Sequence, residues 1–149
     1  MRDLSDHRIL LVNDDGIDAP GMKVLEEVVR QISDDVWVVA PDGNRSGASH
    51  SLSIDSPMRV CKLDDRRFAV SGTPTEGTML GIHELISGRR PSVCISGINR
   101  GPNLAEDTAY SGTIAAAREA TQLGVPAIAI SQVFAPGEKN FTVGEDRKI

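Results

Sequence analysis

Two adjacent carboxylates, Asp14 and Asp15, follow the first apolar run of the chain, Arg8–Asn13, and precede a glycine. Neighbouring carboxylates repel each other, and a tight turn needs only one Asp before a Gly. Carboxylate oxygens are ligands that Mg²⁺ and Mn²⁺ favour, so the pair predicts a divalent cation as well as a turn. One of the two, most simply Asp15, could instead act as a base or nucleophile, and the sequence does not separate these roles.

Two further polar segments could complete such a site. The first is a loop after the second apolar run, and it contains Asn44, Arg45, Ser46 and Gly47. Alone this segment is typical of a solvated loop, but beside a cation Ser46 offers a neutral oxygen and Arg45 a charge for a phosphate. The second segment is "SGINRGPN", in which Asn99 either fixes a turn or gives its carbonyl oxygen to the cation, with Asn103 close by.

An Ala-rich segment, Ser111–Leu123, is predicted to be a helix that ends at Gly124. Its first residues are Ser111, Gly112 and Thr113. They are either a simple helix cap or an anion site, because a helix N-terminus presents free N–H groups and a glycine lets the backbone approach a phosphate.

The remaining pattern alternates strands and helices. The predicted strands are Arg8–Asn13, Val36–Ala40, Ser51–Asp55, Met58–Leu63, Arg67–Ser71, Ser92–Ser96 and Ala127–Ser131. The predicted helices besides Ser111–Leu123 are Asp18–Ser33, with Asp18 as its cap, and Thr73–Ile86, whose "TPTE" is a capping box. This order predicts an α/β fold with a mainly parallel sheet, helices on both faces and a β-hairpin insertion.

The predicted topology brings the polar segments together. In an open parallel sheet, ligands bind beyond the carboxyl ends of the strands. The acidic pair, the 44–47 loop and Asn99 each follow a predicted strand, and the helix that starts at Ser111 points its N–H groups to the same edge. We therefore expect one divalent cation, held by two carboxylates and two neutral oxygens, with positions left for water and a substrate oxygen.

Composition limits the class of protein. The chain has 149 residues, 40% of them hydrophobic and 25% charged, and its net charge of −5 argues against a nucleic-acid groove. No apolar run reaches the roughly 18 residues of a membrane span, so we expect a cytoplasmic protein. Cys61 and Cys94 are predicted to be buried free thiols, and His50 and His83 to be structural. The sequence contains no CxxC motif or cluster of Cys and His residues, so it does not predict a zinc site.

Five ordered blocks resemble the SurE family, the stationary-phase survival nucleotidases. They are "ILLVNDDGIDAPG", "VVAPDGNRSGAS", "SGTPTEGTMLG", "SGINRGPNLAEDTAYSGTIAAAREA" and "LGVPAIAIS", and together they run from Arg8 to Ser131. The resemblance implies a three-layer Rossmann-like fold and a metal-dependent phosphatase of nucleoside monophosphates. It assigns the metal ligands to Asp14, Asp15, Ser46 and Asn99, and the phosphate contacts to Ser111, Gly112 and Thr113.

The resemblance also implies a homodimer or homotetramer that exchanges C-terminal elements. It places the nucleotidase core in residues 1–131, and leaves 132–149 as a C-terminal arm or the start of a truncated segment, since chains of this family run to about 250 residues. Gly43 stands where the family more often has a larger, basic residue, which predicts weaker phosphate affinity.

Two other functions are weighed against the nucleotidase. A receiver-like signalling domain would also bind Mg²⁺ through an acidic pair, but it needs a further Asp at a later strand end, where this chain has Ser96 and Asn99. A noncatalytic nucleotide- or metal-binding module would bind nucleotide without releasing phosphate. A dinucleotide fold is not indicated, because no GxGxxG follows the first strand.

Overall fold

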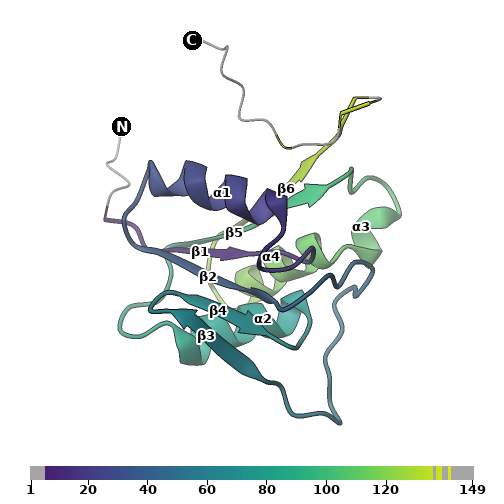
Figure 1. The fold of residues 1–149 in the computed structure, drawn as a ribbon. Helices are drawn as coiled ribbons and strands as arrows, with labels where there is room; N and C mark the ends of the chain where they lie inside the picture. The colour runs from purple at the N-terminus through teal and green to yellow at the C-terminus, as the bar shows by residue number, and fades with distance from the viewer. Residues whose placement is uncertain (1–5, 136, 139–140, 142–149) are drawn as a thin grey trace.

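A six-stranded sheet forms the centre of the protein (Figure 1). The computed structural model describes residues 6–135, 137–138 and 141. The strands run in the order β3-β4-β2-β1-β5-β6, and only β3 is antiparallel to its neighbour. Their bounds are β1 Ile9–Val12, β2 Val36–Pro41, β3 Val60–Asp64, β4 Arg67–Val70, β5 Val93–Arg100 and β6 Ala127–Gln132.

Two hydrophobic layers sandwich this sheet because β1 and β2 are apolar on both faces. On one face Leu11 and Val38 pack against α1, Pro20–Arg30, through Met22 and Leu25. On the other face Leu10 packs with residues of η1, Gly81–Leu85, and α4, Gly112–Gln122. Figure 1 shows α1 on one side of the sheet and α2, Pro74–Leu80, with α4 on the other. The three-layer α/β prediction is confirmed.

Local sequence signals account for most helix boundaries. Thr73 caps α2 through the predicted capping box, in which its side chain accepts from the Glu76 N–H and Glu76 accepts from the Thr73 N–H. Ser111 caps α4 by accepting from Ile114. Gly124 adopts a φ of +82° just beyond α4, as a helix-ending glycine does.

Four predictions of local structure are wrong. Asp18 does not cap α1, since Ala19 holds the cap position and offers no side-chain bond. Residues 51–55 form no strand, because their contacts go to the start of α2 rather than to a neighbouring strand. Cys61 is exposed, because β3 is an edge strand whose five residues all face solvent, whereas Cys94 is buried as expected.

The fourth error concerns the end of the predicted strand Ser92–Ser96, which the sequence pattern places too early. Strand β5 instead continues to Arg100, with an irregular register against β6 between Ser96 and Asn99, and a short helix, α3, covers Asp107–Tyr110. Asn99 therefore lies within a strand, where its backbone is held by β6. Residues 142–149 of the predicted C-terminal arm lie outside the described residues.

The strand order reverses direction at β1, which lies between β2 and β5. The connection from β1 leads to β2 on one side, and the later strands β5 and β6 lie on the other. Such a reversal opens a crevice at the carboxyl ends of the strands, which is where ligands bind in open α/β sheets. The Asp14-Asp15 pair follows β1 directly and is therefore placed at this crevice.

Candidate functional site

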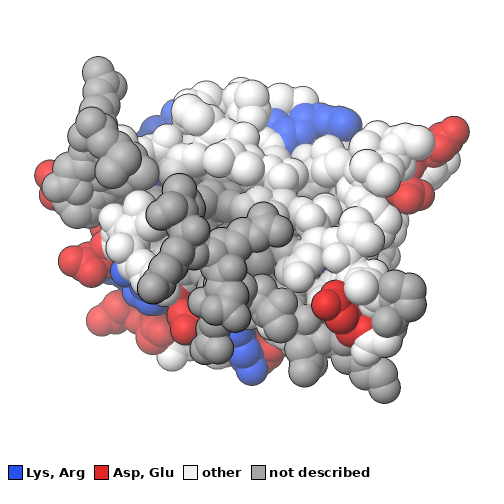
Figure 2. All heavy atoms as spheres, turned by 90° about the horizontal axis from the view of Figure 1, so that it is seen from above, with Lys and Arg blue, Asp and Glu red and all other residues white. Residues whose placement is uncertain are grey.

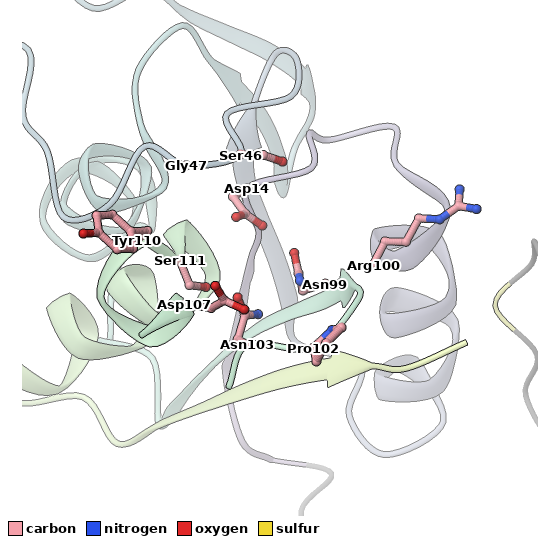
Figure 3. Close-up of a pocket in the computed structure, with 10 residues that line it drawn as sticks. All are labelled: Asp14, Ser46, Gly47, Asn99, Arg100, Pro102, Asn103, Asp107, Tyr110 and Ser111. Atoms are coloured by element: carbon pink, nitrogen blue, oxygen red, sulfur yellow. The ribbon is translucent and has the colours of Figure 1, made fainter. Parts of the chain in front are cut away.

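A pocket of about 250 Å³ lies at this crevice, and Figure 3 shows the side chains around it. Six of the predicted site residues line it: Asp14, Ser46, Gly47, Asn99, Asn103 and Ser111. They come from four separate segments of the chain, as the strand-end argument predicted. Asp14 and Asn99 face each other across the pocket, with the Asn99 amide oxygen toward the Asp14 carboxylate (Figure 3).

Asp14 is held by the chain around it. Its side chain is buried, and its Oδ1 accepts a hydrogen bond of 2.7 Å from the Thr113 hydroxyl. Within the part of the chain that the structure describes, this is the only hydrogen bond to the Asp14 carboxylate, so Oδ2 remains for a ligand. Asn13, which sequence reasoning missed, closes the turn by bonding both the N–H and the carbonyl of Gly16.

The start of α4 approaches Asp14 too closely for any side chain at position 112. A Cβ atom on Gly112 would lie 2.8 Å from the Asp14 Cβ and 3.0 Å from the Pro74 Cγ. Gly112 and Thr113 are fully buried behind Asp14 rather than exposed in the pocket. Their place indicates that they position the carboxylate, while Ser111 reaches the pocket itself.

Asp15 and Asn44 line a neighbouring hollow of about 240 Å³ together with Arg100. Asp15 Oδ2 accepts a 3.3 Å hydrogen bond from the Arg100 backbone N–H. Burial raises the pKa of Asp15, and the negative charge of Asp14 raises it further, against the smaller lowering effect of Arg100. The two carboxylates therefore repel each other in the folded protein, and a cation bound beside them would offset this repulsion.

The Ser46 loop is joined to Asp14 by backbone, because the Arg45 N–H donates to the Asp14 carbonyl at 2.7 Å. Asn44 stabilises the loop by accepting from the Ser46 N–H. The Arg45 guanidinium lies outside the pocket, where it donates to the Ser71 carbonyl at 3.0 Å and to Asp42 at 3.2 Å. Sequence reasoning expected this side chain to contact phosphate.

The residues around the pocket fit a hard divalent cation. The Asn99 Nδ2 donates to the Gly101 carbonyl at 3.0 Å, which leaves the amide oxygen as a free acceptor. Among the described residues, no group of three or more His, Cys, Asp or Glu is arranged to hold a metal. A cation here would depend on the two carboxylates and on neutral oxygens, a donor set that suits Mg²⁺ or Mn²⁺ rather than zinc.

Sequence reasoning missed four residues that line the pocket: Arg100, Pro102, Asp107 and Tyr110. All of them belong to the segment between Asn99 and Ser111, to which the sequence pattern assigns no strand or helix. The available signal was the place of this segment between a predicted metal ligand and a predicted phosphate contact. Asn103, in the same segment, donates to the Ser131 hydroxyl at 2.7 Å and so joins the pocket to β6.

Fold and site together define a class: a three-layer Rossmann-like α/β protein with an oxygen-rich, acidic pocket at the switch point of its sheet. The model of the family described as "Survival protein SurE" matches residues 9–147. The chain belongs to the SurE family.

Named relatives agree with this assignment. The chain is 58% identical over 132 residues to the "5'-nucleotidase SurE" of Paramagnetospirillum magneticum, covering 89% of this chain and 51% of that one. It is 56% identical over 133 residues to the protein of the same name from Phenylobacterium zucineum, covering 88% and 52%. The chain thus spans about half the length of the curated relatives it matches.

A solved structure has the same fold. The crystal structure of the SurE protein from Aquifex aeolicus superposes with a TM-score of 0.78 at 44% sequence identity, over 83% of this chain and 50% of that chain. The family match gives no support to a receiver-like domain.

Proposed function

We propose that this protein is a divalent-metal-dependent phosphomonoesterase, a 5'-nucleotidase that hydrolyses nucleoside monophosphates to nucleoside and phosphate, with hydrolysis at the 3' position as the further activity that the panel below tests. The observation that carries the proposal is the convergence of Asp14, Ser46, Asn99 and Ser111 on one pocket from four segments. The relatives named 5'-nucleotidase SurE support it.

The proposed cofactor is one Mg²⁺ or Mn²⁺ ion per subunit, held by Asp14, Asp15, Ser46 and Asn99. When bound, such an ion lowers the pKa of a coordinated water and neutralises phosphoryl charge. As an alternative to its role as a ligand, Asp15 is the simpler choice for the base or nucleophile, because its carboxylate lines the neighbouring hollow beside Asn44. Asp14 is fixed by Thr113 and is better placed to act as a ligand.

Substrate phosphate is proposed to lie beside Ser111, at the N-terminus of the eleven-residue helix α4, whose dipole favours an anion. Asn44, Arg45, Gly47 and Asn103 complete the proposed substrate-side set, whereas Gly112 and Thr113, which the sequence also assigned to it, act on the site through Asp14. Gly47 adopts a φ of +75°, which lets the loop backbone turn at the pocket. In this structure Arg45 would need to leave Asp42 to contribute.

The wider setting is also part of the proposal. The protein would act in the cytoplasm as a homodimer or homotetramer, with its nucleotidase core in residues 1–131. None of the helices in the described part of the chain has the length and apolar character of a membrane span. On the face shown in Figure 2, the Lys and Arg side chains lie apart rather than in a stripe that would follow a nucleic-acid backbone.

The test is phosphate release from a panel of 5'- and 3'-mononucleotides with Mg²⁺, with Mn²⁺ and with EDTA. We expect turnover only with metal, and a loss of about 10²- to 10⁴-fold in Asp15→Asn, the range for removal of a catalytic base. Asp65→Asn, on the exposed hairpin, is the control and should turn over normally. Full activity in EDTA would contradict the proposal, and nucleotide binding without phosphate release would favour the noncatalytic module.

A further inference from the structure

The loop that carries Ser46 and Gly47 is fastened to the segment that leads into α4. The Ser49 hydroxyl donates to the Ala109 carbonyl at 2.8 Å, and the Ser49 N–H donates to the Tyr110 carbonyl at 3.2 Å. One residue further on, the His50 Nε2 lies 2.6 Å from the Glu119 Oε2. The third of these contacts is the only one that joins the loop to the body of α4 through two side chains.

Glu119 is an unusual residue for its position on α4. Its side chain is largely buried, with 11% of its area exposed, between Arg118, which faces solvent, and the buried Ala120. A carboxylate in such a place is costly unless it is paired. In the described part of the chain the hydrogen-bond partner of the Glu119 carboxylate is His50, which is itself partly buried.

A single helix therefore holds two parts of the candidate site. At its start, Thr113 bonds Asp14 and Gly112 packs against it. About two turns later, Glu119 holds the loop that contains Ser46. The position of the Ser46 loop relative to Asp14 is therefore fixed on both sides of Ser46: by the Arg45 N–H bond to the Asp14 carbonyl before it, and by the His50–Glu119 contact after it.

The backbone of the loop also needs this support. Ser49 has a φ of +54°, a left-handed conformation that residues with a side chain rarely adopt. Such residues persist where the surrounding structure over-determines them. Here the surrounding contacts are those of Ser49 with residues 109 and 110, and of His50 with Glu119.

We propose that the His50–Glu119 pair is a positioning element of the metal site, which holds Ser46 opposite Asp14 and Asn99. Neither residue lines the pocket, so neither is a catalytic residue. The inference rests on the proposed function in one respect, namely that Ser46 is a metal ligand. The fastening of the loop itself rests on contacts in this structure alone.

The test measures two quantities on purified full chain without any turnover: the Mn²⁺ dissociation constant by electron paramagnetic resonance, and amide hydrogen exchange at residues 45–49. The variants are His50→Ala, Glu119→Ala and His50→Gln, with Arg118→Ala as the matched control on the exposed side of α4. Circular dichroism and a urea midpoint establish that each variant is folded.

We expect His50→Ala to weaken Mn²⁺ binding by about 10-fold, the low end for loss of an outer-shell partner, and to accelerate exchange of the Arg45 and Ser49 amides. Glu119→Ala should match it, because both break the same contact. His50→Gln should restore both readouts, since its amide can still bond Glu119, and Arg118→Ala should change neither.

Unchanged amide exchange in the folded His50→Ala chain would overturn the inference, as would faster exchange with an unchanged Mn²⁺ dissociation constant. A wild-type chain that binds no Mn²⁺ would instead overturn the proposed function. In that case the exchange rates alone would decide whether the pair fastens the loop.

Discussion

At the scale of single residues, the candidate site depends on how closely α4 approaches the acidic turn. Asp14 is buried and accepts its hydrogen bond from Thr113, which is also buried. The approach is possible because position 112 lacks a side chain. Sequence reasoning singled out Gly112 for its closeness to a phosphate, whereas the structure shows that its first neighbour is the Asp14 carboxylate.

Gly112→Ala tests this approach. The added methyl group would lie 2.8 Å from the Asp14 Cβ and 3.1 Å from its Oδ2, so the carboxylate must move. We expect a net loss of about 1–2 kcal/mol in the free energy of unfolding, since overpacking costs more than the helix propensity of Ala returns. Displacement of a reacting group by about 1 Å can cost 10²-fold, so nucleotidase turnover should fall by about that factor.

Urea unfolding and phosphate release measure these two effects. Gly43→Ala is the control for the unfolding measurement, because a Cβ there meets no atom within 4 Å. If Gly112→Ala kept wild-type stability and turnover, the tight packing of α4 against Asp14 would not matter for either.

At the scale of elements, the start of α2 links three parts of the chain. Thr73 accepts from the Glu76 N–H, donates to the Ser51 carbonyl, and receives the Glu76 carboxylate on its own N–H. Glu76 in turn accepts from the Ser53 N–H. One capping box thus forms the N-terminus of α2 and also binds the loop of residues 51–53, which follows the Ser46 loop in the chain.

Thr73→Ala should therefore lower the free energy of unfolding by about 1 kcal/mol or slightly more, the usual cost of losing a helix cap. Asp18→Ala is the matched control, because Asp18 was predicted to cap α1 and makes no cap bond there. It should change the stability by less than about 0.5 kcal/mol, as exposed surface changes do. Equal losses in the two variants on urea unfolding would contradict the assigned caps.

The two helices also show what sequence can and cannot predict. Thr73 has both halves of its capping box within four residues, so local sequence determines the outcome. Asp18 offered only one half of such a signal, and Pro20 starts the helix, so the extended residue before it, Ala19, holds the cap position. The continuation of β5 to Arg100 depends on pairing with β6, which lies about 30 residues further on and leaves no local signal.

The same distinction applies to the site. Asp14, Ser46, Asn99 and Ser111 were predictable because each follows a strand or starts a helix, and topology brings those points together. The direction of the Arg45 side chain was not, because it depends on the Ser71 carbonyl, 26 residues away. Strand ends can be counted from sequence, but side-chain directions are set by tertiary partners.

At the scale of the whole molecule, ion pairs join several segments at the amino ends of the strands, which is the end of the sheet opposite the site. Asp35, just before β2, accepts from the Arg8 Nε at 2.8 Å and from the Trp37 indole at 2.9 Å. Arg66 and Arg89 each lie 3.4 Å from the same carboxylate. Asp35 thereby joins the residue before β1, the β3–β4 hairpin and the turn before β5.

This cluster predicts how stability depends on pH. Burial alone would raise the pKa of Asp35, but hydrogen bonds from Arg8 and Trp37 and the charges of Arg8 and Arg66 outweigh it, so the pKa falls below its ordinary 3.8. A carboxyl with a depressed folded-state pKa stabilises the fold above its unfolded pKa, and this stabilisation is lost as pH falls from about 4 toward the folded value. Asp35→Asn should therefore unfold more easily at pH 7 and lose less stability on acidification, so that the difference between the two free energies of unfolding narrows as pH falls below about 4. Urea unfolding from pH 7 to pH 3 measures this difference, and the exposed Asp55→Asn is the control for removal of a charge. A constant difference between the free energies of unfolding of wild type and Asp35→Asn across that range would show that the cluster contributes nothing through ionisation.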